Sequence, residues 1–172
     1  MVKTGNNWGL ACNSIHMIDL LVFLTGQDDL RFDLEQLDNT VYPSRREGFK
    51  ELRGKFSVNT GRGDILEILD QDSFEDDYPE ISIVTDKMRF TIKESYGLVS
   101  ADQADMNMQE HSHTFPFQSE LTGYVVDQII DTGQSDLTPY TECMQYHIPM
   151  LDAFNTHFSK VTRKTVKICP IT

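Results

Sequence analysis

The stretch WGLACNSIHMIDLLVFLTG occupies residues 8–26 and contains the first long apolar segment of the chain, residues 15–24. Gly26 closes the stretch, and glycine readily adopts the left-handed conformation that ends helices. Two polar side chains, His16 and Asp19, interrupt the apolar segment and lie on one face of the predicted helix. Burying two such groups is costly unless they have partners. The stretch therefore predicts a buried helix whose polar pair has hydrogen-bond partners or a chemical role.

The region between residues 31 and 102 has the pattern of short strands. Apolar side chains recur at every second residue, which is typical of strands with one buried face. Residues 59–63 and 85–87 are rich in turn formers and separate these segments. The pattern predicts antiparallel hairpins. The apolar positions that carry it are Phe56, Val58, Ile81, Ile83, Met88, Phe90 and Ile92.

Two helical patterns and a final extended segment follow. From Ser119 onward the apolar side chains have helical spacing up to Gly133, which predicts an amphipathic helix packed against the rest of the domain. A second helix is predicted to begin at Thr138–Pro139, and residues 165–169 are predicted to form a last strand. Strands followed by consecutive helices indicate an α+β fold, with a largely antiparallel sheet and helices packed on one face.

Composition excludes several classes of function. The 172 residues with 39% hydrophobic content suit one domain, and the formal net charge of −12 disfavours binding to nucleic acid or to anionic membranes. No apolar run is long enough to span a bilayer, so the protein is expected to be soluble and cytoplasmic. Cys12, Cys143 and Cys169 are far apart in the sequence and are predicted to be reduced thiols.

The stretch from Cys12 to Gly26 resembles a motif of the Gfo/Idh/MocA family, which includes glucose-fructose oxidoreductase and inositol dehydrogenase. The family motif has the form D-x-x-x-H-x-x-D-x-x-x-x-L-x-G, and His16, Asp19 and Leu24 occupy its later positions. The segments around residues 45–49 and 147–151 are also similar to the family. The sequence departs from the motif at Cys12, where the family has an aspartate.

The resemblance implies that residues 1–172 form a single α+β substrate-binding and oligomerisation domain, and that the N-terminal Rossmann domain with its catalytic lysine is absent from this chain. It implies NAD or NADP as the cofactor of the full-length enzyme and a sugar, polyol or nucleotide sugar as substrate. No G-x-G-x-x-G segment follows a predicted strand, so we expect no cofactor in this chain. The isolated chain is therefore expected to be inactive, and a homo-oligomer formed through the sheet face is expected.

His16 is the residue that the resemblance marks as catalytic. A neutral imidazole suits the removal of a hydroxyl proton while nicotinamide accepts the hydride. If Asn13 caps the helix, His16 lies in its first turn, where the helix dipole favours the neutral ring. Asp19 is expected to be structural. The absence of an acid at Cys12 suggests either compensation by another residue, a different substrate or weakened activity.

Four other residues are candidate substrate contacts, each with an ordinary structural alternative. Asn13 is first a helix cap, and Trp8 either stacks on a sugar ring or packs in the core. Arg46, next to Arg45, either binds a phosphate or carboxylate or is a surface charge. His147, close to Pro149, either faces a cleft or packs on the sheet.

Two other functions remain open from the sequence. One is a non-enzymatic binding or dimerisation module, which the loss of the acid at Cys12 favours. The other is a metal-dependent hydrolase, because His111 and His113 lie on the same side of an extended segment; we nevertheless predict no metal site, since no third ligand has a recognisable spacing. The acidic residues 70–77 do not match a calcium loop, and residues 62–64 read as a hairpin turn.

Overall fold

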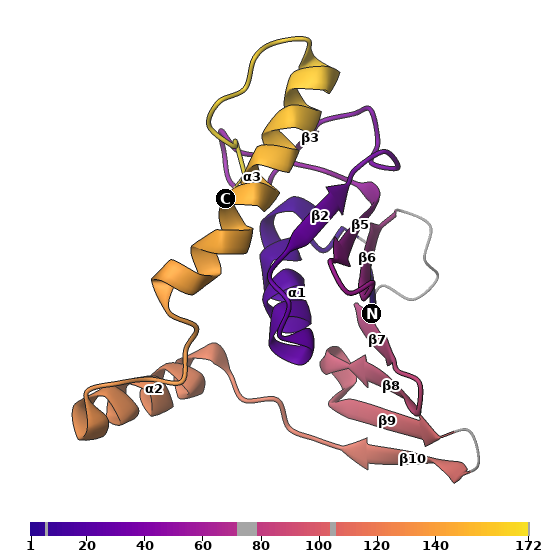
Figure 1. Ribbon diagram of the computed structural model, residues 1–172, viewed down its shortest axis with the longest axis vertical. Helices are drawn as coiled ribbons and strands as arrows, with labels where there is room; N and C mark the ends of the chain where they lie inside the picture. The colour runs from indigo at the N-terminus through magenta and orange to yellow at the C-terminus, as the bar shows by residue number, and fades with distance from the viewer. Residues whose placement is uncertain (6, 72–78, 104–105, 172) are drawn as a thin grey trace.

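The computed structural model describes residues 1–5, 7–71, 79–103 and 106–171. Its elements along the chain are β1 (Val2–Thr4), α1 (Leu10–Thr25), β2 (Leu30–Asp33), β3 (Tyr42–Pro43), β4 (Lys50–Glu51), β5 (Gly54–Thr60), β6 (Ile65–Asp70), β7 (Glu80–Val84), β8 (Met88–Lys93), the 3-10 helix η1 (Glu94–Tyr96), β9 (Leu98–Gln103), β10 (Met106–Ser112), α2 (Gln118–Thr132) and α3 (Tyr140–Thr162). The α+β prediction is confirmed (Figure 1).

The main sheet has eight strands in the order β10-β9-β8-β7-β1-β6-β5-β2. Its pairs are antiparallel except for β1, which runs parallel to β6 and antiparallel to β7. The hairpins β5–β6, β7–β8 and β8–β9 agree with the predicted meander. The predicted strand at residues 165–169 is wrong, because these residues form no ladder. The carboxyl-terminal tail is attached to β4 by one backbone bond, from the Lys50 N–H to the Pro170 carbonyl at 2.8 Å.

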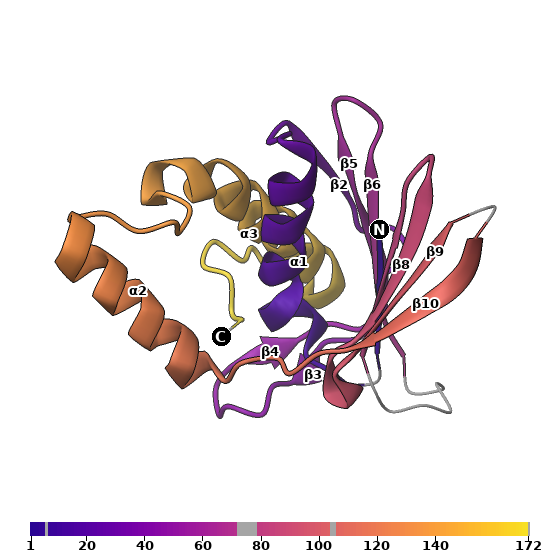
Figure 2. The same cartoon turned by 90° about the horizontal axis from the view of Figure 1, so that it is seen from below.

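Helices α1 and α3 cover the half of the sheet that contains β6, β5 and β2 (Figure 2). Helix α1 begins five residues earlier than predicted, and its first residues Leu10 and Ala11 are fully buried. Phe154 of α3 meets Phe56 of β5 edge to face, with ring centroids 5.5 Å apart. The core thus lies between these two helices and the sheet.

Helix α2 does not pack as predicted. None of its residues is buried. Even the large apolar side chains are exposed: Tyr124 is 72% exposed and Ile130 is 75% exposed. Figures 1 and 2 both show α2 standing apart from the sheet and from α1. Its apolar face therefore has no covering layer within the described residues. Among those residues, no helix has the length and apolar character needed to cross a membrane.

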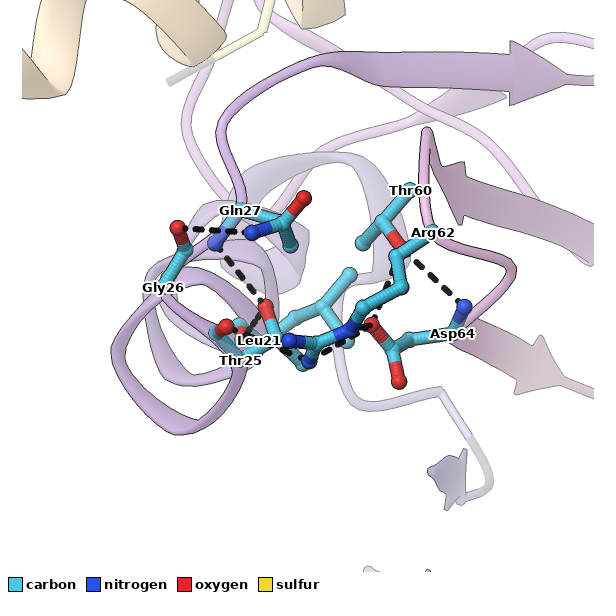
Figure 3. Close-up of polar contacts among 7 residues, drawn as sticks. All are labelled: Leu21, Thr25, Gly26, Gln27, Thr60, Arg62 and Asp64. Carbon is cyan, nitrogen blue, oxygen red and sulfur yellow. Dashed lines mark hydrogen bonds and ion pairs between the residues drawn. The ribbon is translucent and has the colours of Figure 1, made fainter.

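Arg62 ties the end of α1 to the β5–β6 turn (Figure 3). Its guanidinium donates to the Thr25 carbonyl at 3.2 Å and pairs with Asp64 at 3.1 Å. A cation at this place complements the negative end of the helix dipole. Gly26 has the left-handed conformation predicted for it, and its N–H donates to the Val22 carbonyl at 2.7 Å. Residues 62–64 are part of this turn, as the sequence predicted.

His157 of α3 is a buried histidine whose titration should be visible in the stability of the domain. Its Nε2 lies 3.1 Å from the Asp38 carbonyl oxygen, and burial lowers its pKa from 6.5. The folded domain therefore binds a proton at His157 less readily than the unfolded chain does. The free energy of unfolding thus keeps its full value above pH 6.5 and decreases as the pH falls below it. Melting temperatures at pH 7.5 and 5.5 should differ more for the wild type than for His157→Gln. Equal pH dependence of the two proteins would contradict this assignment.

Candidate functional site

A cavity of about 460 Å³ opens at the amino end of α1. Volumes of this size are typical of small-molecule sites. The cavity brings together three of the predicted substrate contacts, Trp8, Asn13 and Arg46, from the loop before α1, its first turn and the segment between β3 and β4. Cys12, the residue that departs from the family motif, lies in the same wall. The sequence-predicted residues therefore gather mainly at one end of one helix.

The first turn of α1 is held by other residues than predicted. Gly9, in the left-handed conformation, is the N-cap, and Asn13 lies within the helix. The Asn13 amide instead donates to the carbonyls of Trp8 at 2.7 Å and Gly9 at 3.1 Å. The predicted N-cap role of Asn13 is thus wrong, and His16 lies beyond the first turn. The helix dipole acts mainly within one turn, so it does not set His16 apart from the other residues in the middle of α1.

Glu51 supplies the capping that the sequence assigned to Asn13. One of its carboxylate oxygens accepts the N–H of Ala11 at 2.5 Å and that of Leu52 at 2.9 Å. A carboxylate at a helix amino terminus is favoured by the unpaired N–H groups and by the dipole. Burial nevertheless raises the pKa of Glu51, and the same effect raises the pKa of the nearby Cys12 thiol. Cys12 is therefore a poor replacement for the ionised acid of the family motif.

Asp70, at the end of β6, is the second carboxylate of the cavity wall and is only 1% exposed. Burial raises its pKa, although the backbone N–H groups of Asn7 and Leu10 and the charge of Arg53 favour its ionised form. Neither of its oxygens completes a hydrogen bond of good geometry with the described residues. A signal for Asp70 exists in the sequence, because it continues the alternation of the buried Leu66 and Ile68 on β6.

Trp8 is half-buried and fixed in place. Its indole N–H donates to the Leu69 carbonyl at 3.0 Å, and the Lys3 ammonium lies 5.5 Å from its ring centroid. A ring held in this way forms a rigid wall of the cavity. Lys3 itself is 3% exposed and its pKa is lowered by burial, with Glu94 at 3.4 Å as its partner.

The arginines occupy the segments around β3 and β4. Arg45 and Arg46 line the cavity and are exposed, while Arg53 lies over the ring of Tyr42 at 4.3 Å. The cavity wall therefore combines the carboxylates of Glu51 and Asp70 with guanidinium groups. Sequence reasoning missed Arg53 and Tyr42, which have no pattern that distinguishes them from surface residues.

His16 and His147 do not line this cavity. His16 is exposed on α1, one turn beyond Cys12. His147 of α3 has its Nε2 3.2 Å from the Asp19 carboxylate. Asp19 also contributes, after burial, to raising the pKa of Tyr146 to about 12. The two polar residues of α1 thus have different surroundings. His16 is exposed, and the Asp19 carboxylate joins α1 to α3.

The histidines considered for a metal site lie at the sheet edge. His111 is on β10, and His113 follows the strand, with its ring 5.2 Å from that of Phe115. Within the part of the chain that the structure describes, no group of three or more histidine, cysteine or acidic side chains is arranged to hold a metal ion. Most of the acidic segment 70–77 lies outside the described residues. Cys12, Cys143 and Cys169 are free thiols.

Comparison with solved structures places this arrangement among known folds. The chain is similar to a UDP-N-acetylglucosamine 3-dehydrogenase from Acidithiobacillus ferrooxidans, with a TM-score of 0.61 and 8% identity over 88% of this chain and 50% of that one. It is similar to a Gfo/Idh/MocA family oxidoreductase from Vibrio cholerae, with a TM-score of 0.51 and 15% identity over 95% of this chain and 52% of that one. The chain has the fold of the C-terminal α+β domain of the Gfo/Idh/MocA oxidoreductases.

A dehydrogenase from Clostridium difficile has the same Gfo/Idh/MocA-type fold in this part, with a TM-score of 0.59 and 12% identity over 90% of this chain and 52% of that one. The chain thus spans about half the length of the solved structures it resembles. No family model and no curated protein matched its sequence.

Proposed function

We propose that this chain is the substrate-side domain of an NAD(P)-dependent oxidoreductase that acts on a sugar, polyol or nucleotide sugar. The observation that carries the proposal is the cavity at the amino end of α1, which combines Trp8, Asn13 and Arg46 in a fold that otherwise forms half of dehydrogenase chains. A tryptophan wall, amide and carboxylate groups and guanidinium groups suit the recognition of a hydroxylated ligand. An upstream Rossmann domain would bring the nicotinamide cofactor to this ligand.

His16 is the proton-transfer residue of this proposal. It is exposed, and it lies one turn along α1 from the cavity wall at Cys12. An exposed side chain beside a cavity is free to contact a substrate held between this domain and a second one. His16 would accept the hydroxyl proton of the substrate, and a nicotinamide cofactor bound by the upstream domain would supply the hydride acceptor. Asp19 and His147 instead join α1 to α3 and keep the helix in place.

The test uses the chain joined to its native upstream sequence. His16→Ala should lower kcat by about 100-fold or more, because general base catalysis contributes that much. NAD(P)-dependent oxidation of a panel of sugars and nucleotide sugars is the measurement. His111→Ala on the exposed β10 edge is the matched control and should leave kcat unchanged. Unchanged turnover in His16→Ala would refute its role. The isolated chain should show no turnover with either nucleotide.

A second candidate is a non-enzymatic binding or dimerisation module with this fold. Cys12 in place of the acid favours it, and so does the uncovered apolar face of α2, which suits contact with another chain. The gene sequence immediately upstream of Met1 discriminates between the two candidates. An in-frame Rossmann domain supports the enzyme, whereas a stop codon supports the module.

A further inference from the structure

Helix α2 carries apolar side chains around most of its circumference. At about 100° per residue, the arc that runs from Tyr124 to Ile130 around the axis covers about 240° and contains all six of them. The three acids, Glu120, Asp127 and Asp131, fall within about 40° of one another on the remaining side. A helix that is apolar over so wide an arc is ordinarily buried. The six apolar residues are Leu121, Tyr124, Val125, Val126, Ile129 and Ile130.

This apolar arc is uncovered in the single chain. Helix α2 has no buried residue, and it stands apart from α1 and from the sheet in both views (Figures 1 and 2). A helix of 15 residues is marginal in water unless an apolar face packs against another surface. Contiguous exposed apolar surface of this kind marks an interaction site. Helix α2 therefore requires a partner that covers it.

Three polar side chains within the arc already have their hydrogen bonds inside the chain. The hydroxyls of Thr122 and Thr132 donate to carbonyls four residues earlier in the helix, at 2.8 and 2.7 Å. The Gln128 amide donates to the Asp136 carboxylate at 2.6 Å, and its oxygen accepts the Asp136 N–H at 2.9 Å. Burial of a polar group is costly mainly when the group is left unpaired. This side of α2 can therefore be covered by an apolar surface without losing these bonds.

The charges around α2 indicate which partner it takes. Residues 94–159 contain ten acids and no lysine or arginine, so this part of the chain repels nucleic acid and anionic membrane surfaces. A second copy of α2 is not repelled, because the acids lie opposite the middle of the arc at Val125 and Ile129. When two arcs face each other, both acidic stripes point into solvent and no like charges meet.

The exposed area suits a dimer. Five of the apolar side chains of α2 are between 47% and 75% exposed, and Phe117 at its start is 78% exposed. At about 150–250 Å² for a large side chain, one chain offers roughly 550–900 Å² of apolar surface here. A two-fold contact uses this surface twice, and the total reaches the range of specific interfaces, about 1,200–2,000 Å².

We propose that two copies of this chain associate through α2, with the two helices side by side about a two-fold axis and their acidic stripes facing solvent. The N-terminus and α2 lie on different sides of α1 in both views (Figures 1 and 2). A domain attached ahead of Met1 thus starts across α1 from this surface and leaves it to the second copy. The inference does not depend on the proposed oxidoreductase.

Sedimentation equilibrium of the 172-residue chain measures the association. We expect twice the 19.7 kDa mass of one chain at about 1–100 μM, since interfaces of this size bind with micromolar affinity or better. Ile130→Asp places a charge in the contact twice and should raise the dimer Kd at least about 100-fold. Ile168→Asp is the matched control, at an 86% exposed position in the tail, and should dimerise as the wild type does. A monomeric wild type, or an equal Kd for the two variants, overturns the proposal.

Two other interfaces are separated by further measurements. Thr91 lies on β8 between Phe90 and Ile92, which line a cavity beside α1, so its side chain points to the opposite face of the sheet. Thr91→Glu should leave the dimer intact. A dimer that is lost in Thr91→Glu but kept in Ile130→Asp forms through the sheet face and contradicts the proposal. The chain joined to its native upstream sequence should also dimerise through α2, and a monomer would mean that the upstream domain covers α2 instead.

Hydrogen exchange of the wild type decides the question if Ile130→Asp fails to fold. The amides of α2 should exchange more slowly as the protein concentration rises, because an unpacked helix of this length opens readily. Exchange that is independent of concentration across the dissociation range excludes α2 from the contact. Neither measurement needs a cofactor or an upstream domain, so the dimer and the oxidation assay with His16→Ala succeed or fail independently.

Discussion

Replacing Phe154 with alanine should lower the free energy of unfolding by about 3–5 kcal/mol, the usual loss for a buried phenylalanine. Phe154 is fully buried on α3 and packs edge to face on Phe56 of β5. The substitution removes the ring contact and leaves a cavity between helix and sheet. Since small domains are stable by about 5–15 kcal/mol, much of the population should unfold at moderate urea concentrations. Urea denaturation followed by circular dichroism measures the change.

Phe23→Ala is the matched control for this experiment. Phe23 lies on α1 and is 83% exposed, so its loss should change the unfolding free energy by less than about 0.5 kcal/mol. A similar loss in both variants would show that the core is not between α3 and β5. The pair therefore tests the layering of the domain as well as the single residue.

Gly54→Ala should destabilise the domain by about 2–5 kcal/mol, from a left-handed backbone and an overlap together. Gly54 begins β5 with φ of 102°, and a Cβ there would lie 2.7 Å from the Gln36 carbonyl oxygen and 2.9 Å from the Asp38 nitrogen. Both atoms belong to backbone hydrogen bonds, with Lys55 and with Arg53, so neither moves without loss. The melting temperature and the urea midpoint should both fall.

Gly63→Ala separates the two causes. Gly63 has a similar φ of 97°, and a Cβ there would meet no atom within 4 Å. Gly63→Ala should lower the free energy of unfolding only by the cost of an alanine at positive φ, about 1–2 kcal/mol. The difference between the two variants measures the overlap at Gly54. Equal losses would mean that the segment at Gln36 and Asp38 moves aside freely.

The sequence predicts most of the fold because local patterns carry it. The end of α1 at Gly26, the end of α2 at Gly133 and the hairpins of β5 to β9 follow from turn residues and apolar periodicity. Strand β1 has only three residues and pairs with strands more than 60 residues away, so no local pattern announces it. Residues 165–169 are predicted to be a last strand but form no ladder. The tail instead follows the end of α3 at Arg163, where the backbone turns left-handed.

The candidate site is only partly predictable for the same reason. Trp8, Asn13 and Arg46 were found because they lie in or near the family-like segments. Glu51 and Asp70 come from strands that are distant in sequence, and only the folded sheet brings them to the amino end of α1. The sequence predicts Asn13 as the helix cap, but Glu51 accepts the Ala11 N–H at the start of α1. Glu51 is distant in sequence, so only the fold brings its carboxylate to the helix.

Strand β1 lies in the interior of the eight-stranded sheet, between β6 and β7. It joins the strands β2, β5 and β6 on one side to β7–β10 on the other. A domain attached ahead of Met1, as proposed above, would therefore pull on the middle of the sheet and not on an edge. Tension on that linker would load two rows of backbone hydrogen bonds at once, those to β6 and those to β7. A motion of the upstream domain would then displace both halves of the sheet, because β1 is hydrogen-bonded to each of them.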